Sequence, residues 1–378
     1  IYKVVLDRTA FFPEEGGQIA DKGVLTFSLK EESVGNGEHI TILPEKTLKL
    51  LDAHIKQDII YHYVEQEIPV GTVIKGSVDW SQRFDFMQQH SGEHIISGLV
   101  NKYYGYDNVG FHLGLQEVTL DFNGVLTLEQ LREIELEANE AIWKNLPVEI
   151  AFPSSEKLQS LEYRSKLDLT ENVRIVTIPG YDVCACCAPH VGRTGEIGVI
   201  KLLDFIRYKG GVRIHLLCGA AALADYRLRY AQSAEISAKL SVKQNDLTPA
   251  IERVIAERDE YKLALRAANH RLADAMVAAV EPTDRPVYFI GSNWDVDMLR
   301  RLVNGLTARC GGLCAAYSGS DGVYTYVLGG TDRLKEAAQE MNDALHGRGG
   351  GDSRQVQGRV QATAKEIAAY WRSKGAAE

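Results

Sequence analysis

A change of composition between Ala220 and Val280 sets the strongest limit on how this chain can fold. This segment is dominated by Ala, Leu, Glu, Lys and Arg, most of which favour helix. The spacing of a coiled-coil seam, alternating four and three residues, links Leu247, Ile251, Val254, Arg258, Tyr261, Leu265, Ala268 and Leu272. Thr248 and Pro249 fit an N-cap and a first helical position. We therefore expect two helices, joined as a hairpin, in residues 221–280.

The helical segment separates regions with different strand and helix patterns. Residues 1–79 alternate short β-branched runs with turn residues, as in "YKVVL" and "VIKGSVDW", which predicts a small antiparallel β-barrel. Residues 80–220 begin with predicted helices near 81–104 and 127–145 and then return to strand patterns, whereas residues 281–378 alternate strands with helices. We predict an α+β protein with an N-terminal β-barrel, a central α+β domain, a helical hairpin linker and a C-terminal α/β domain.

Two pairs of metal-binding residue types share the spacing of one helical turn. His90 and His94 lie four residues apart within the first predicted helix and therefore on one face of it. An isolated pair of this kind is often two surface or core histidines, but Cys186 and His190 repeat the spacing in "VCACCAPHVGRTGEIG". Imidazole nitrogen and thiolate sulfur are the ligands of tetrahedral zinc. We predict one Zn²⁺ per chain, bound by His90, His94, Cys186 and His190.

The cysteine count and the charge limit the class of protein. Six cysteines are too few for a disulfide scaffold in a chain of 378 residues, and three crowd beside His190, which favours a metal in a reducing compartment. Spacing leaves Cys184 and Cys187 open as rival ligands. No apolar run approaches the roughly 18 residues that span a bilayer, and no signal peptide is visible, so we expect a cytoplasmic protein without a membrane partner. The net charge of −9 argues against nucleic-acid binding by the whole surface.

Several motifs resemble one known family. "RFDFMQQHSGEHIISGLV" and "CCAPHVGRTGEIG" are similar to the zinc motifs of the alanyl-tRNA synthetase editing domain and of its freestanding editing relatives of the AlaX type. Residues 7–23, "DRTAFFPEEGGQIADKG", resemble the Gly-rich segment of the barrel before that domain. Residues 347–359, "GRGGGDSRQVQGR", resemble a motif of the synthetase's C-terminal domain that DHH-type phosphoesterases also carry. The aminoacylation domain of the synthetases is not seen, so we expect a large freestanding editing protein.

The resemblance implies an ATP-independent enzyme of translation fidelity. Its reaction would be hydrolysis of the ester in mischarged Ser-tRNA(Ala) or Gly-tRNA(Ala), acting in trans as an aminoacyl-tRNA deacylase. A second site is needed because a pocket for alanine cannot strongly reject a slightly smaller side chain, or one with an added hydroxyl. A zinc with an open position could lower the pKa of a bound water to roughly 7, whereas a zinc with four protein ligands would organise the pocket.

The resemblance also implies roles outside the metal motifs. The segment "NVGFHLG", residues 108–114, would line the pocket, with Gly110 allowing close approach and His112 acting as a base or hydrogen-bond donor. Arg83 and Gln89 flank the zinc motif and would contact the terminal adenosine, although a solvated surface role is equally open. The family has Gly-Gly-Thr between its Cys and His, where this chain has Cys-Ala-Pro, and proline removes a backbone donor. The details of the amino-acid pocket therefore differ from the family pattern.

The C-terminal tail is the part of this acidic chain that could contact phosphate. Residues 345–378 carry an excess of three positive charges, and glycine lets backbone amides approach a ligand. The expected tRNA contacts are Arg348, Gly349, Gly350, Gly351, Arg354 and Arg359. A flexible loop without a ligand is the alternative. The resemblance also allows a homodimer through the C-terminal region, although an intramolecular hairpin would use the same apolar stripe.

Two other functions compete with editing. A phosphoesterase or nuclease of the DHH type would need an Asp-His-His metal signature, and the sequence contains none. A non-catalytic, zinc-stabilised tRNA-binding or dimerisation factor stays open, and a deacylation assay separates it from the enzyme. Within the enzyme class, the amino acid removed could differ from serine or glycine.

Overall fold

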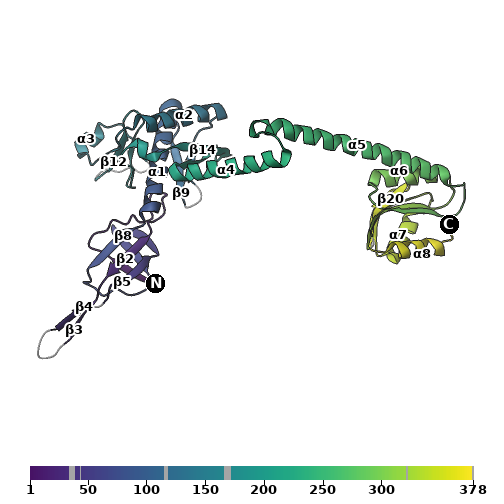
Figure 1. The fold of residues 1–378 in the computed structure, drawn as a ribbon, viewed down its shortest axis with the longest axis horizontal. Helices are drawn as coiled ribbons and strands as arrows, with labels where there is room; N and C mark the ends of the chain where they lie inside the picture. Colours follow the sequence, from purple (N-terminus) through teal and green to yellow (C-terminus); the bar gives the residue numbers. More distant parts are fainter. Residues whose placement is uncertain (34–38, 43, 115–117, 166–171, 321, 377–378) are drawn as a thin grey trace. The chain divides into compact units, whose positions relative to one another are not determined.

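The computed structural model describes residues 1–33, 39–42, 44–114, 118–165, 172–320 and 322–376. The chain forms two compact units, Ile1–Glu235 and Ile236–Glu378 (Figure 1). Eight α-helices and several small sheets make up the described residues, so the predicted α+β class is confirmed, while the layout in four domains stays a prediction. None of the helices in these ranges is both long and apolar enough to cross a membrane.

Two three-stranded antiparallel sheets form the first part of the N-terminal unit. One contains β1 (Tyr2–Val5), β7 (Ile59–Val64) and β6 (Asp52–Lys56), and the other contains β5 (Lys46–Leu50), β2 (Gly23–Phe27) and β8 (Ile74–Val78). A separate antiparallel pair is formed by β3 (Lys30–Ser33) and β4 (His39–Ile42). Because side chains alternate across each strand, Leu25, Leu48 and Val64 share one core with Phe11. A closed barrel stays a prediction.

Helix α1 (Trp80–Tyr104) is the central element of the N-terminal unit and matches the helix expected at 81–104. Asp79 caps its start by accepting hydrogen bonds from the backbone N–H groups of Ser81 and Gln82. Gly105 ends it in the left-handed conformation, at φ 66°. All residues from 88 to 100 are buried. A helix surrounded on every side can hold polar side chains only where they are hydrogen-bonded.

Two further sheets surround this helix. The larger has the antiparallel order β14 (Ile200–Tyr208), β15 (Gly211–Cys218), β10 (Val118–Phe122) and β9 (Asn108–Leu113), and it shares a core with α1 and with α2 (Leu128–Lys144). The smaller contains β11 (Glu149–Ala151), β12 (Ile175–Ile178) and β13 (Asp182–Ala185), and the second metal motif directly follows β13. Short helices α3 (Ser155–Gln159) and η1 (Thr194–Ile197) complete the region.

Helices α4 (Gly219–Leu240) and α5 (Leu247–Ala279) occupy the segment where two helices were predicted, with the short 3₁₀ helix η2 (Gln244–Asp246) before α5. The predicted start of the second helix is wrong by two residues. Asp246 is the N-cap, and Pro249 lies inside the first turn, where its missing N–H is not needed.

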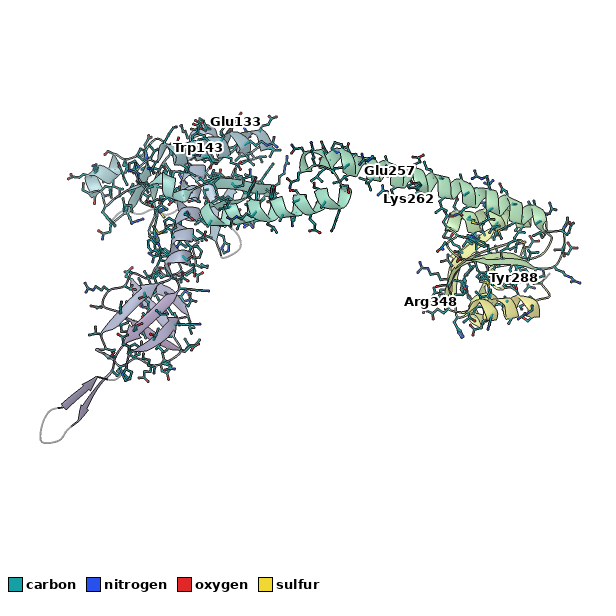
Figure 2. The ribbon with its side chains drawn as sticks, in the orientation of Figure 1. Glu133, Trp143, Glu257, Lys262, Tyr288 and Arg348 are labelled. Atoms are coloured by element: carbon teal, nitrogen blue, oxygen red, sulfur yellow. The ribbon has the colours of Figure 1, made fainter. Side chains whose placement is uncertain are left out.

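The predicted seam of α5 is exposed to solvent. Ile251, Val254, Tyr261 and Leu265 are 43–73% exposed, and Figure 2 shows the polar side chains of the same helix projecting outward. The end of α5 instead packs on α6 (Val296–Thr307) in a core that includes Ala273. A role of the seam in dimerisation therefore stays a prediction.

The C-terminal unit is built around a five-stranded mixed sheet. Its order is β16 (Val287–Gly291), β17 (Cys314–Ser320), β18 (Val323–Gly329), β20 (Gln355–Val360) and β19 (Arg348–Gly351), and only β16 and β17 are parallel. Alternate residues of β17 belong to two different cores. Cys314 and Ala316 pack with α5 and α6, whereas Ala315 and Tyr317 pack with α7 (Leu334–Ala344) and α8 (Ala364–Ser373).

The Gly-rich motif of this unit forms a β-hairpin of β19 and β20, not the flexible loop that was the alternative. Gly349 in β19 pairs with Gly358 in β20. A Cβ added at Gly349 would lie 2.2 Å from the hydroxyl of Tyr326, so a side chain there would collide with the sheet beneath. Glycine is therefore needed at position 349 because this edge of the sheet packs closely, and not because a loop requires a flexible backbone.

Candidate functional site

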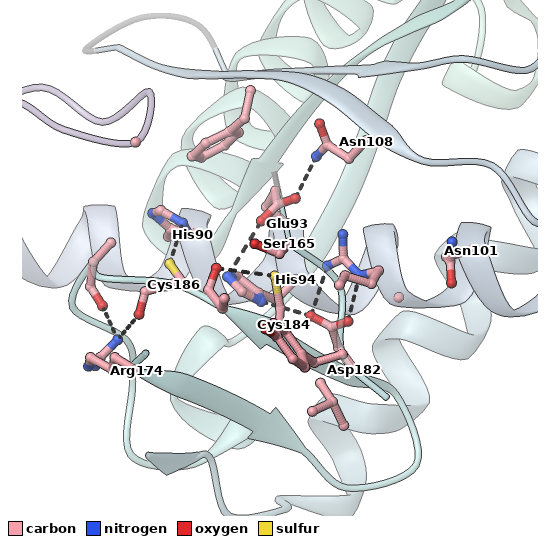
Figure 3. Close-up of a pocket in the computed structure, with 18 of the residues that line it drawn as sticks. His90, Glu93, His94, Asn101, Asn108, Ser165, Arg174, Asp182, Cys184 and Cys186 are labelled. Carbon is pink, nitrogen blue, oxygen red and sulfur yellow. Dashed lines mark hydrogen bonds and ion pairs between the residues drawn. The ribbon is translucent and has the colours of Figure 1, made fainter. Parts of the chain in front are cut away.

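Four side chains from the two metal motifs meet inside the N-terminal unit. One ligand atom from each of His90, His94, Cys186 and His190 lies within 4.8 Å of the others. Sγ of Cys186 is 3.5 Å from Nε2 of His90 (Figure 3), and it is 3.4 Å from Nε2 of His190. A tetrahedral zinc ion with ordinary bond lengths requires N···S separations of roughly 3.6 Å. The donor set and its spacing therefore fit a bound metal ion of this kind.

Each of the three imidazoles is oriented through its second ring nitrogen. Nδ1 of His90 lies 2.9 Å from Oε1 of Gln18, and Nδ1 of His94 lies 2.8 Å from Oδ2 of Asp182. The remaining histidine, His190, places Nδ1 3.2 Å from the hydroxyl of Ser91. Contacts of this type fix the tautomer and the ring direction of metal-binding histidines. All three Nε2 atoms are thus available to one ion.

The Gly-rich N-terminal segment delivers Gln18 to this site. The backbone N–H of Leu113 in β9 donates to the carbonyl of Gly17 at 2.7 Å. Gly17 has φ +86°, and a Cβ there would lie 2.3 Å from the carbonyl oxygen of Phe111, so only glycine fits. Gln18 is 1% exposed, and its Nε2 has no hydrogen-bond partner among the described residues.

The charges around the cluster favour a cation. Burial opposes a charged ring at His94, but Glu93, Asp182 and Cys186 outweigh it and raise the pKa of His94 well above its usual range. Burial likewise raises the pKa of the Cys186 thiol, yet the surrounding imidazoles hold that pKa far below its usual range. Surroundings that stabilise a positive ring and a thiolate also stabilise a bound divalent ion.

The rival cysteines differ from Cys186 in their surroundings. Burial raises the pKa of Cys184 to about 11, and burial together with Glu15 raises the pKa of Cys187 to about 12. Both stay protonated near neutral pH, and a thiol is a much poorer metal ligand than a thiolate. Cys184 can form a second candidate cluster with His94 and Asp182, but that aspartate is already bound by Arg164. Cys186 is therefore the favoured thiolate ligand.

A cavity of about 930 Å³ opens beside the four ligands. Its wall includes Glu93, Asn108, Phe111, Arg164 and Arg174, besides three of the four candidate ligands. Arg174 donates to the carbonyls of Cys186 and Ala188 at 2.7 and 3.0 Å, which fixes the turn between Cys186 and His190 (Figure 3). The volume is within the range of pockets that hold small molecules.

The structure separates two residues of the predicted pocket segment from the cavity. The ring of Phe111 packs on His90, with ring centroids 4.7 Å apart. Successive side chains of a strand point to opposite faces, so His112 lies on the other face, where it pairs with Thr119 and is exposed. A Cβ at Gly110 would point at Asp121, not into the cavity. These placements give no support to a catalytic role of His112 or Gly110.

Arg83 and Gln89, the predicted adenosine contacts, are both engaged elsewhere. The Arg83 guanidinium binds the buried carboxylate of Asp21, with Nε 2.9 Å from Oδ1, and donates to the carbonyl of Ala10. Gln89 is 2% exposed, and its amide exchanges two hydrogen bonds with the backbone of Cys218, at 2.8 and 3.0 Å. Both side chains join α1 to neighbouring elements, and their role as adenosine contacts stays a prediction.

The predicted tRNA contacts lie at one edge of the C-terminal sheet. Arg348 and Arg359 face each other across β19 and β20, and neither forms an ion pair within the described part of the chain. A hollow of about 900 Å³ is lined by Val296, Val323, Thr325, His346, Arg348, Gln357, Gly358, Arg359 and Gln361. Arg354 lies on the turn between these strands, where its guanidinium is 3.7 Å from Asp352. Figure 2 marks Arg348 within this unit.

Sequence reasoning missed the residues that orient the ligands. Asp182 precedes Cys186 by four residues, but it lies in strand β13, so the spacing of a helical turn gave no signal. Gln18 stands in the Gly-rich motif, and Glu93 stands inside the first metal motif. A polar residue inside one of these motifs is the signal that could have drawn attention to both.

Part of the chain is similar to a known protein family. The family described as the threonyl and alanyl tRNA synthetase second additional domain matches residues 173–215, which contain Cys186 and His190. The second metal motif of this chain therefore lies in a segment that is similar to that domain.

The comparison also identifies particular relatives. The chain is 28% identical to the alanyl-tRNA editing protein AlaX-L of Pyrococcus horikoshii over 97% of this chain and 89% of that protein. It is 26% identical to the alanine–tRNA ligase of Ignicoccus hospitalis and 30% identical to that of Methanoregula boonei, but spans only 33% and 30% of their lengths. The resemblance to a freestanding alanyl-tRNA editing protein is therefore confirmed.

One solved structure is similar to part of the chain. The C-Ala domain of the Aquifex aeolicus alanyl-tRNA synthetase matches 24% of this chain and 89% of that domain, with 20% identity and a TM-score of 0.21. That score is too low to support an argument about the fold.

Proposed function

We propose that this chain is a trans-editing aminoacyl-tRNA deacylase. Its substrates would be Ser-tRNA(Ala) and Gly-tRNA(Ala), and it would hydrolyse the ester between the wrong amino acid and the terminal adenosine. The observation that carries the proposal is the cluster of His90, His94, Cys186 and His190 beside a cavity of about 930 Å³. The similarity to AlaX-L over nearly the whole chain supports ester hydrolysis as the reaction.

Zinc is the metal that we propose for the cluster, held by the same four residues. When bound, zinc acts as a Lewis acid that can polarise an oxygen and lower the pKa of a bound water to roughly 7. Because four ligand atoms lie within reach of one ion, we favour a zinc with four protein ligands, which would organise the pocket. The side chains of the cavity would then position the ester.

The residues of this chain support such positioning. Asp182 and Gln18 hold two of the imidazoles, and Phe111 covers His90 with an apolar ring. Arg174 fixes the turn that follows Cys186. Rigid surroundings of this kind hold a substrate in one orientation and thereby lower the entropic part of the barrier.

A panel of charged tRNAs tests the proposal. Alanine tRNA carrying Ser, Gly or Ala is incubated with the protein, with and without a zinc chelator, and release of the amino acid is measured. We expect rapid loss of Ser or Gly, slow loss of Ala, and inhibition by the chelator. Tight tRNA binding without any ester cleavage would instead favour the non-catalytic tRNA-binding factor.

We also propose that the C-terminal unit holds the tRNA body. Like charges directly opposite in a sheet repel each other, so Arg348 and Arg359 would gain from a bound phosphate. The backbone of Gly349–Gly351 and the guanidinium of Arg354 would extend this contact. A homodimer through the C-terminal region and a cytoplasmic location are further parts of the proposal.

A further inference from the structure

Glu93 is a buried carboxylate for which the proposed function has not yet given a role. It lies on α1 directly before His94, is 5% exposed, and lines the cavity beside the four candidate ligands. Desolvating a carboxylate is unfavourable unless hydrogen bonds or charges compensate. A carboxylate kept at the wall of a substrate-sized cavity therefore calls for a functional explanation.

Two donors fix the orientation of this carboxylate. Nδ2 of Asn108 donates to Oε1 at 2.6 Å (Figure 3), and the hydroxyl of Ser97 donates to the same oxygen at 2.6 Å. Asn108 is itself held, because the backbone N–H of Gly110 donates to its Oδ1 at 3.1 Å. Helix α1 and strand β9 thus supply a rigid support for one oxygen.

The other oxygen lies next to the candidate metal ligands. Oε2 of Glu93 is 3.8 Å from Nε2 of His94, the nitrogen that faces the cluster. A substrate group that binds Oε2 therefore lies close to the His-Cys cluster, where the proposed function places the ester carbonyl. This places a fixed negative group and the reaction site side by side.

The substrate of the proposed function carries a matching group. An aminoacyl ester has a positively charged amino group on the carbon next to the ester carbonyl. We propose, on the basis of that function, that Glu93 binds this α-ammonium group and so positions the carbonyl beside the His-Cys cluster. Hydrogen bonds between ionised groups are roughly twice as strong as those between neutral groups, which makes a desolvated carboxylate selective for the ammonium.

This role predicts a restriction of the substrate class. Esters with a free α-amino group are accepted, whereas N-acylated aminoacyl-tRNA, including peptidyl-tRNA, lacks the charge and is spared. Glu93 would thus be a specificity-determining residue that recognises the part shared by all amino acids. Other residues that line the cavity would determine the preference for serine or glycine over alanine.

Two stable probes test the assignment. One is an alanine acceptor-stem RNA minihelix whose terminal adenosine carries serine through an amide, and the other is identical except that a hydroxyl replaces the α-amino group. We expect the wild-type protein to bind the first about 10- to 100-fold more tightly, the range of one charge-assisted hydrogen bond. Glu93→Gln should remove the preference, and Glu162→Gln, at an exposed carboxylate of the same cavity, should preserve it.

The outcomes separate this inference from the proposed function. Equal wild-type affinity for the two probes overturns the role of Glu93 and leaves the proposed function standing. Failure of the wild-type protein to bind either probe contradicts both. A Glu93→Gln protein that loses its zinc and both probes together would make Glu93 a metal ligand, which also overturns the role. If that variant does not fold, the test uses the wild-type protein and Ser97→Ala. The role of Glu93 then predicts that the wild type prefers the probe with the α-amino group and that Ser97→Ala weakens this preference.

Discussion

Oδ2 of Asp182 accepts a hydrogen bond from Nδ1 of His94 at 2.8 Å, while Arg164 binds the same carboxylate through two hydrogen bonds of 2.7 and 2.8 Å. Burial raises the pKa of Asp182, but the contacts with His94 and Arg164 outweigh it and lower that pKa below its usual value. Asp182 is therefore an ionised second contact that keeps Nε2 of His94 directed at the cluster.

Substitution of Asp182 by Asn should weaken metal binding about 10- to 100-fold, the usual effect of losing such a contact. The affinity is measured by competition with a chromogenic chelator. Asp204→Asn is the matched control, because it removes another aspartate paired with a histidine, His215, away from the cluster. Equal zinc affinities of the Asp182 variant and the wild type would show that the contact does not orient the ligand.

Replacing single cysteines should identify the thiolate ligand. With Co²⁺ in place of zinc, a thiolate ligand gives a sulfur-to-metal charge-transfer band, and we expect Cys186→Ser to abolish it. Cys184→Ser and Cys187→Ser should keep the band, because those thiols have raised pKa values of about 11 and 12. Loss of the band in either of these variants would reassign the ligand.

Substitution of Arg83 by Met should destabilise the protein without changing its substrate affinity. The change leaves the buried carboxylate of Asp21 without its cation, which typically costs about 3 kcal/mol or more. The free energy of unfolding is measured by urea titration, and minihelix affinity is measured on the folded fraction. A stable variant with weakened minihelix binding would instead support Arg83 as an adenosine contact.

Removing the cross-strand arginines should weaken tRNA binding in a salt-dependent manner. We expect Arg348→Ala and Arg359→Ala each to reduce the slope of log affinity against log salt by about one, the effect of one lost phosphate contact. Arg333→Ala serves as the control, since Arg333 is paired with Glu336 on α7. Unchanged slopes in both cross-strand variants would remove this sheet edge from the tRNA interface.

The metal ligands could be predicted from the sequence because their signal is local. His90 and His94 are related by one helical turn of α1, and the start and end of that helix follow from the cap at Asp79 and from Gly105. Cys186 and His190 show the same spacing, although they lie in a turn rather than a helix. A tight turn brings residues four apart together almost as well as a helix does.

The surroundings of the site could not be predicted, because they depend on contacts between distant segments. Gln18 reaches His90 from a loop 72 residues away, and its placement requires Gly17 to approach β9 closely. The choice between Phe111 and His112 as the residue facing the cluster depends on the register of β9. A shift of one residue would exchange the two, and no local pattern fixes it.

We propose that one zinc ion is held by His90, His94, Cys186 and His190 beside the cavity. X-ray absorption at the zinc edge of the purified protein tests this most directly. We expect one zinc per chain with three nitrogen neighbours at about 2.0–2.1 Å and one sulfur at about 2.3 Å. A protein without zinc, or a zinc ion whose first shell contains no sulfur or more than one, would contradict it.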